Sequence, residues 1–191
     1  MKVGLYRYAL VLAAGLTMQV GIARAADVFN VTSPVFKDND AWPSKYAGID
    51  PKRTPGCGGE NVSPPIAWSN APEKTKSFAV MMYDIDAGNG LSNTHWVIYG
   101  LPLNKTSLAE GEGGTPSKDF VAGKNGYGDD HYFGPCPPAG NAPHHYLITV
   151  IATDLAPDAL KPGLTREEVI ASLRGHALRG ATIVGRYTRP D

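Results

Sequence analysis

The sequence predicts a mainly β protein, built from antiparallel strands with long loops between them and one helix near the C-terminus. Short runs of β-branched and aromatic residues alternate with turn-rich stretches. The 191 residues include 22 Gly and 16 Pro, which favours many turns and few long helices. With 42% hydrophobic and 19% charged residues, a chain of this length can bury one sizeable core.

The expected strands are the short runs of β-branched and aromatic residues. In chain order they are Val28–Thr32, Ile66–Trp68, Phe78–Tyr83, Trp96–Leu101, Tyr146–Thr153 and Ala181–Tyr187. The stretches between them include three long loops that are too rich in glycine and proline for tight hairpins, at 51–65, 87–93 and 111–140. Long loops carried by a rigid scaffold often bear function.

One segment, Thr165–Arg179, has the periodicity of a helix. Thr165 and Glu168 form a capping box, and apolar residues then recur at helical spacing up to Ala177. Gly180 fits the C-terminal end of this helix, and His176 is expected to pack within it.

The first 25 residues are typical of a secretory signal rather than of a folded element. Lys2 and Arg7 precede an apolar stretch, 8–22, and Ala23-Arg24-Ala25 supplies the small residues of a cleavage site. The alternative is an uncleaved anchor, but the apolar stretch is shorter than the ~20 residues of a spanning helix. We therefore expect a signal peptide at 1–25, a single domain at 26–191 and a periplasmic or secreted protein.

The charge balance argues against nucleic-acid binding. The chain has 18 Lys and Arg against 18 Asp and Glu, whereas nucleic-acid binding normally shows as a basic domain or stripe. Loss of the three basic residues in the expected signal peptide leaves 15 basic against 18 acidic residues, a balance that does not attract an anionic membrane.

Polar residues gather where the expected strands begin or end. Asp84 and Asp86 follow one strand, His95 precedes another, and His144 and Tyr146 open a third after a Gly/Pro-rich loop. Two carboxylates two residues apart share a face of an extended segment, as do His144 and Tyr146. Imidazole, phenol and loop N–H groups can all donate hydrogen bonds to a phosphate oxygen.

Several neighbouring residues are more simply explained as structural or solvent-exposed than as ligand-binding. His145 alternates with His144 and is expected to point to the opposite face as a structural or solvent-exposed residue. Asp129, Asp130 and His131 resemble metal ligands, but adjacent residues on a glycine loop usually form a solvated turn. We expect no metal and no cofactor.

The chain has two cysteines, Cys57 and Cys136. An oxidising compartment would let them pair, while two buried or free thiols remain the alternative. A bridge that spans these 79 positions would stabilise the fold by about 4 to 5 kcal/mol in the loop-entropy treatment.

Five motifs occur in the order seen in the phosphatidylethanolamine-binding proteins, and the chain most resembles their bacterial Raf-kinase-inhibitor-like branch. The motifs are Cys57-Gly58-Gly59-Glu60-Asn61-Val62-Ser63-Pro64-Pro65-Ile66-Ala67-Trp68, Asp84-Ile85-Asp86-Ala87, His95-Trp96, Gly134-Pro135-Cys136-Pro137-Pro138 and His144-His145-Tyr146. The resemblance extends from about Ser33 to Arg189. It implies a large antiparallel sheet packed on a smaller one, short flanking helices, and an anion-binding pocket at one edge.

The resemblance also implies a ligand set and places both cysteines near the pocket, so we expect a Cys57–Cys136 disulfide. The expected lining is Asp84, Asp86, His95, the backbone of Gly134 and Pro135, His144 and Tyr146. One motif departs from the family pattern: the usual Asp-Pro-Asp-Ala-Pro reads Asp84-Ile85-Asp86-Ala87-Gly88. Without the two prolines we expect a less rigid loop, which proline at 85 and 88 should stiffen if the backbone angles allow it.

Three classes of function fit these residues. The first is a binding protein for a phosphate or phosphoethanolamine-like head group, which could derive from a phospholipid. The second, implied by the family, is an inhibitor of a kinase or protease, although an exported chain would not meet a cytosolic kinase. The third is an enzyme that uses an Asp/His pair, with Cys136 as a conceivable nucleophile unless a disulfide removes it. The first is the function that the sequence favours, and enzymatic activity is less expected; the sequence does not indicate an oligomeric state or a protein partner.

Overall fold

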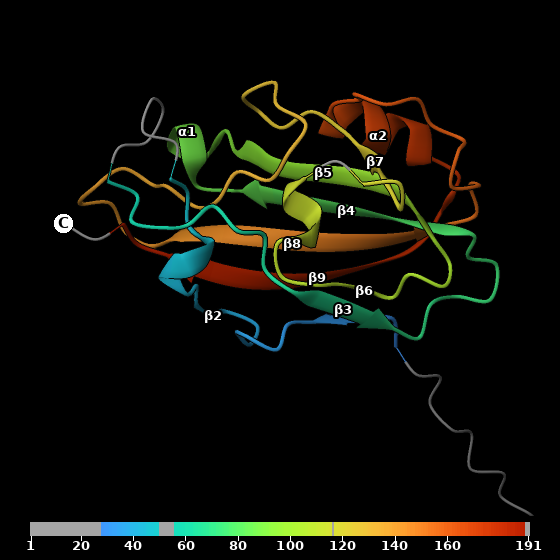
Figure 1. Ribbon diagram of the computed structural model, residues 1–191, viewed down its shortest axis with the longest axis horizontal. Coiled ribbons are helices and arrows are strands. Elements are labelled where there is room, and N and C mark those ends of the chain that lie inside the picture. The colour runs from blue at the N-terminus through green and yellow to red at the C-terminus, as the bar shows by residue number, and fades with distance from the viewer. Residues whose placement is uncertain (1–27, 50–55, 116, 190–191) are drawn as a thin grey trace, which may run out of the picture.

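The structure, a computed structural model, describes residues 28–49, 56–115 and 117–189 and consists of two packed β-sheets (Figure 1). The expected signal peptide and its cleavage point lie outside the described residues. The smaller sheet has the strand order β1 (Asn30–Thr32), β3 (Ile66–Ser69), β6 (Ser107–Leu108). The larger has the order β2 (Asp40–Ala41), β9 (Ala177–Tyr187), β8 (His144–Thr153), β4 (Ser77–Asp84), β5 (Asn93–Pro102), β7 (Val121–Ala122).

The main core fills the space between the two sheets. Aromatic side chains dominate it: Phe78 of β4 meets Trp68 of β3 edge-on, with ring centroids 5.3 Å apart. A second apolar cluster lies on the other face of the large sheet, where Met81 and Val97 pack against Val169 and Leu173 of α2 (Arg166–Leu173). Because β4 is covered on both faces, nearly all of its residues are buried, which explains its continuous apolar sequence.

The structure confirms each expected strand, with small shifts at the ends. It adds three two-residue strands, β2, β6 and β7, which are too short to produce a periodic pattern. The large sheet is antiparallel except at its edge, where β2 pairs in parallel with β9 through Asp40↔Gly185 and Ala41↔Arg186.

The helix near the C-terminus is shorter than expected. Its capping box is confirmed, since Thr165 Oγ1 accepts a hydrogen bond from the Glu168 N–H and Glu168 Oε2 accepts one from the Thr165 N–H. The end expected at Gly180 is wrong: α2 ends at Leu173, and Gly175 adopts a φ of 82°. Ala177–Arg179 instead open β9, because this segment pairs with the end of β8. Pairing between strands therefore overrides the helical periodicity.

His176, expected inside that helix, lies in the turn between α2 and β9, where its Nδ1–H donates to Asp154 Oδ1 at 2.8 Å. The remaining helical segments are short: α1 (Ala87–Gly90), η1 (Ser44–Tyr46) and η2 (Glu112–Gly114). None of the helices in the described parts of the chain has the length and apolar character needed to cross a bilayer.

Candidate ligand-binding site

A cavity of about 330 Å³ lies at the end of the large sheet where β4 ends and β5 and β8 begin. Four of the expected site residues line it: Asp84, Asp86, His95 and His144. The rest of the lining comes from loops: Ala87, Gly88, Asn89, Asn93, Tyr127, Cys136, Pro137, Pro138 and Asn141. Gly134, Pro135 and Tyr146 lie close by in the chain but are not part of the described lining.

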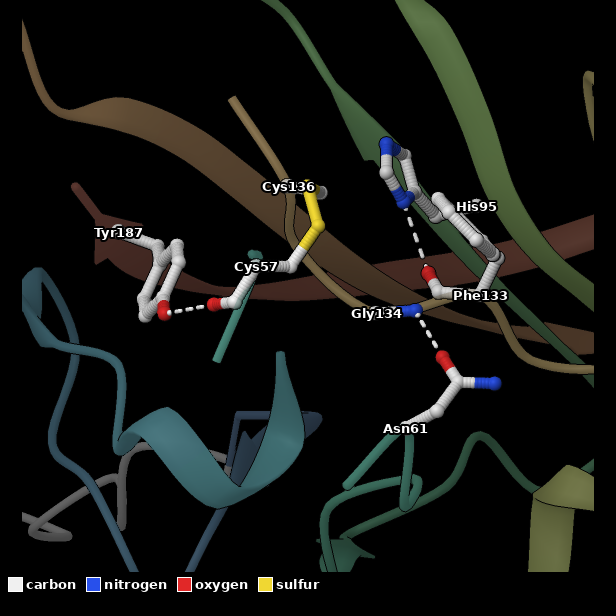
Figure 2. The surroundings of a disulfide bond; sticks show 7 residues. All are labelled: Cys57, Asn61, His95, Phe133, Gly134, Cys136 and Tyr187. Atoms are coloured by element: carbon white, nitrogen blue, oxygen red, sulfur yellow. Dashed lines mark hydrogen bonds between the residues drawn. A yellow bond between two sulfur atoms is a disulfide. The ribbon is translucent and has the colours of Figure 1, made fainter. Parts of the chain in front are cut away.

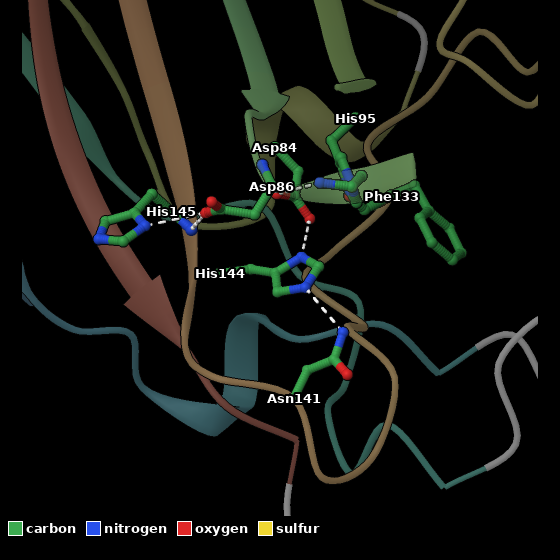
Figure 3. A network of polar contacts seen from close by, with 8 residues as sticks. Asp84, Asp86, His95, Phe133, Asn141, His144 and His145 are labelled. Atoms are coloured by element: carbon green, nitrogen blue, oxygen red, sulfur yellow. Dashed lines mark hydrogen bonds and ion pairs between the residues drawn. The ribbon is translucent and has the colours of Figure 1, made fainter. Parts of the chain in front are cut away.

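Strand register brings Asp84 and His144 together. Asp84 at the end of β4 is paired with Tyr146 of β8, so His144 is its diagonal neighbour on the same face. Both side chains are buried, and His144 Nδ1 lies 2.7 Å from Asp84 Oδ2. Since a carboxylate only accepts, the Nδ1–H donates. The pairing fixes the imidazole so that Nε2 is the nitrogen left for other partners (Figure 3).

The Nε2 of His144 meets a residue that the sequence analysis did not single out. Asn141 Nδ2 lies 3.3 Å from it, in the loop that leads into β8 (Figure 3). The only sequence indication for Asn141 was its place in the Gly/Pro-rich segment just before His144. Asn93 and Tyr127 also line the cavity, and no motif pointed to either of them.

His95 reaches the cavity from a β-bulge. Met82 pairs with Trp96 and Tyr83 with Thr94, so His95 is the extra residue in β5. Bulges re-aim side chains and are frequent beside functional sites. Its Nδ1–H donates to the carbonyl oxygen of Phe133 at 2.8 Å, which leaves Nε2 for a ligand (Figure 3). Burial disfavours the charged ring and lowers the pKa of His95, against the opposing effect of the Phe133 hydrogen bond.

Tyr146 supports the cavity from below. Its side chain is fully buried, and its ring packs edge-on against that of His95 with centroids 5.2 Å apart. Burial and the nearby Asp84 carboxylate raise its pKa, so the phenol stays neutral. The hydroxyl has no hydrogen-bond partner among the described residues. The expected shared face of His144 and Tyr146 is thus observed, and both side chains are buried.

Asp86 turns toward the other face of β8. Its Oδ2 accepts hydrogen bonds from the backbone N–H of His145 at 2.7 Å and from His145 Nδ1 at 2.9 Å. Burial would raise the pKa of Asp86, but the hydrogen bonds from His145 outweigh it and the pKa lies below its ordinary value. The two carboxylates therefore do not act as one pair: each contacts a different one of two consecutive histidines (Figure 3).

Backbone groups of Gly134 and Pro135 are already hydrogen-bonded to other segments of the chain. The N–H of Gly134 donates to Asn61 Oδ1 at 2.8 Å (Figure 2). The carbonyl oxygen of Pro135 accepts from the N–H of Gly48 at 2.9 Å. The backbone expected to bind a ligand therefore holds the loop in place in this structure.

Cys57 and Cys136 form a disulfide, as expected, with Cα atoms 5.2 Å apart (Figure 2). Cys136 is also part of the cavity lining. The Tyr187 hydroxyl donates to the Cys57 carbonyl oxygen at 2.8 Å, which ties the bridge to the end of β9. The thiol of Cys136 is consumed in the disulfide and cannot act as the nucleophile considered above.

The charge of the lining is unusual for an anion site. Among the described residues that line the cavity, none is Lys or Arg, and the charged groups are carboxylates. Imidazoles are the groups that can supply positive charge, each through protonation. Within the described chain, no group of three or more His, Cys, Asp or Glu side chains is arranged to hold a metal ion.

Comparisons with known proteins agree with the motifs. The sequence model of the family described as phosphatidylethanolamine-binding protein matches residues 32–188. The chain is 36% identical over 162 residues to a UPF0098 protein of Methanothermobacter thermautotrophicus, covering 84% of this chain and 99% of the relative. It is 33% identical over 165 residues to LppC of Mycobacterium tuberculosis, a protein named as a lipoprotein, covering 86% and 75% of the two chains.

A comparison with solved structures also finds a protein described as a member of this family. The crystal structure of Escherichia coli YbcL, described as a member of the mammalian PEBP family, superposes with a TM-score of 0.75 at 32% sequence identity, covering 84% of this chain and 98% of that one. The chain belongs to the phosphatidylethanolamine-binding protein family.

Proposed function

We propose that this protein is an exported binding protein whose cavity holds a small anionic head group of the phosphate or phosphoethanolamine type. One observation carries the proposal: His144 and His95 line one cavity of about 330 Å³, and Asp84 and the Phe133 carbonyl oxygen engage their Nδ1 atoms. The Nε2 of each ring, which in His144 contacts Asn141, is therefore the nitrogen that a ligand can reach.

The chemistry favours the phosphate end of such a ligand. Both carboxylates are occupied by imidazoles, which leaves them poorly placed to receive an ammonium group. A phosphate oxygen can accept a hydrogen bond from the Nε2–H of His144 when this ring is protonated, while the Nδ1–H stays on Asp84. With no Lys or Arg among the described lining residues, the positive charge must come from imidazolium. Anion binding should therefore take up a proton and strengthen as the pH falls.

Export is supported by the Cys57–Cys136 disulfide, because such bonds persist in oxidising compartments. A relative named as a lipoprotein points the same way. We propose that residues 26–191 form the mature domain and that 1–25 direct it to the periplasm or outside the cell.

Calorimetric titration tests the ligand proposal. Inorganic phosphate, phosphoethanolamine and phosphatidylethanolamine vesicles are titrated at pH 6 and pH 8, which separates a free anion from a lipid head group as the source. Removing one donor to a charged ligand costs about 1.5 to 3 kcal/mol, so His144→Ala should weaken binding roughly ten- to 150-fold.

His176→Ala is the matched control, since His176 is also paired with an aspartate but lies outside the described lining. Equal affinities for the wild type and His144→Ala would remove His144 from the site.

A further inference from the structure

We infer that His145, which does not line the cavity, determines the preference of the cavity for anions by holding the carboxylate of Asp86. The inference rests on the proposed function and deepens it: His145 acts as a positioning residue for the binding site, through Asp86.

The first support is the set of contacts that His145 makes with the segment after β4. Its N–H and Nδ1–H both donate to Asp86 Oδ2, at 2.7 and 2.9 Å, and its carbonyl oxygen accepts from the N–H of Ile85 at 3.2 Å. Figure 3 shows the two imidazoles of His144 and His145 pointing away from each other, with Asp84 and Asp86 divided between them. Three hydrogen bonds from one residue thus fix the start of the loop that lines the cavity.

The second support is that the Asp86 side chain does not cap α1. Asp86 is the N-cap residue of α1, a position where an aspartate side chain ordinarily accepts from the helix backbone. Here it makes no such bond, because its Oδ2 is directed to His145. The backbone N–H groups of Asp86 and Ala87 are satisfied by Asp84 Oδ1 instead, at 2.9 and 3.1 Å.

The third support is the charge of the cavity. Of the described lining residues, Asp84 and Asp86 are the carboxylates, and no Lys or Arg offsets them. The Nδ1–H of His144 donates to Asp84, and the Nδ1–H of His145 holds the Asp86 carboxylate from the outer face of β8. The lowered pKa of Asp86 keeps it ionised near neutral pH. Without His145, an ionised carboxylate on the cavity wall would repel an anion and attract a cation.

The loop's own hydrogen bonds hold its backbone rather than the Asp86 side chain: the Gly90 N–H donates to the Asp86 carbonyl oxygen at 3.3 Å, and the Ser92 N–H to the Ala87 carbonyl oxygen at 3.0 Å. Gly88, Asn89 and Ser92 have φ values of 59°, 60° and 65°, which are costly for the two that are not glycine. The prolines of the family pattern are absent from it. Asp84 holds the backbone at the N-terminal end of this segment, and the contacts with His145 hold the Asp86 side chain.

The test is a double-mutant cycle with inorganic phosphate as the probe. His145→Ala should weaken phosphate binding roughly three- to tenfold, the effect of one carboxylate that is no longer held away from the ligand in a partly solvated site. Asp86→Asn should bind phosphate at least as tightly as the wild type. In the Asp86→Asn background, His145→Ala should change the affinity less than twofold, because the carboxylate is gone. Ethanolamine should bind more tightly to His145→Ala than to the wild type.

His176→Ala, which removes a comparable His–Asp pair at 2.8 Å outside the cavity, is the control and should leave phosphate binding unchanged. His145→Gln, which retains a side-chain donor for Asp86, should recover part of the affinity and replaces His145→Ala if that variant does not fold.

The outcomes separate the two proposals. An equal loss from His145→Ala in the wild-type and Asp86→Asn backgrounds would show that His145 acts through loop structure and would overturn the inference. So would unchanged phosphate binding in His145→Ala while His144→Ala still loses affinity, with the proposed function left standing. A wild type that does not bind phosphate would overturn both.

Discussion

Two consecutive histidines of β8 have different chemistry because each contacts a different carboxylate. His144 is buried beside Asp84, whereas His145 is partly exposed beside Asp86. Alternation along the strand decides which face each occupies. Which carboxylate each receives is decided by the turn after Asp84, where the chain leaves the strand and Asp86 swings to the outer face.

His95 makes stability depend on pH. Its pKa is lowered in the folded protein by burial, while in the unfolded chain it titrates near 6.5. Below that pH the unfolded chain binds a proton that folded His95 does not, so the free energy of unfolding should fall as the pH decreases from about 6.5 toward the folded pKa. Urea unfolding at pH 7.5 and pH 5.5 measures the difference in the free energy of unfolding between the two pH values, for the wild type and for His95→Gln. The difference should be smaller in the variant, and an identical pH dependence would show that His95 is not responsible.

At the scale of elements, the backbone of the loop after β4 is incompatible with proline at 85 and 88. Proline at 85 and 88 should stiffen the loop only if the backbone angles allow it, and Gly88 has a φ of 59°, which proline cannot adopt. The N–H of Ile85, which proline lacks, donates to the His145 carbonyl oxygen. The loop therefore follows a path that requires its non-proline residues.

We predict that Gly88→Pro and Ile85→Pro each lower the free energy of unfolding by at least ~1 kcal/mol. Gly88→Ala should cost about 1 to 2 kcal/mol, from the left-handed backbone alone. Ile85→Val, which keeps the N–H, is the control and should stay close to the wild type in a thermal melt. Stabilisation by both prolines would show that the loop takes the family's path.

The capping box of α2 gives a second prediction at this scale. Thr165→Ala removes the hydroxyl that accepts from the Glu168 N–H and should cost about 1 kcal/mol. Thr165→Ser keeps the hydroxyl and should retain most of the stability. Chemical denaturation of the three proteins measures the difference. Equal losses in the alanine and serine variants would assign the effect to the methyl group rather than to the cap.

At the scale of the whole molecule, the disulfide joins two loops 79 positions apart at the edge of the cavity. We predict that the Cys57→Ser, Cys136→Ser double variant loses up to about 4 to 5 kcal/mol of stability, the cost of releasing the closed loop in the unfolded chain. Because Cys136 lines the cavity, phosphate binding should weaken as well. Denaturation and calorimetry of the double variant and of the wild type with and without reductant check both effects. An unchanged midpoint of unfolding would contradict the structural role of the bridge.

The sequence alone determined what depends on short-range patterns. Alternation placed His144 and Tyr146 on one face and His145 on the other, apolar runs located the long strands, and Thr165 with Glu168 marked the start of α2. These features are local, because a period of two or an N-cap is set within a few residues.

Only the tertiary structure decided what depends on partners distant in the chain. The bulge that turns His95 into the cavity arises from pairing with β4, and the end of α2 is set by the pairing of β9 with β8. The division of Asp84 and Asp86 between two histidines follows from contacts across about 60 positions. No local period encodes these contacts, because they form only when strands are brought into register and buried together.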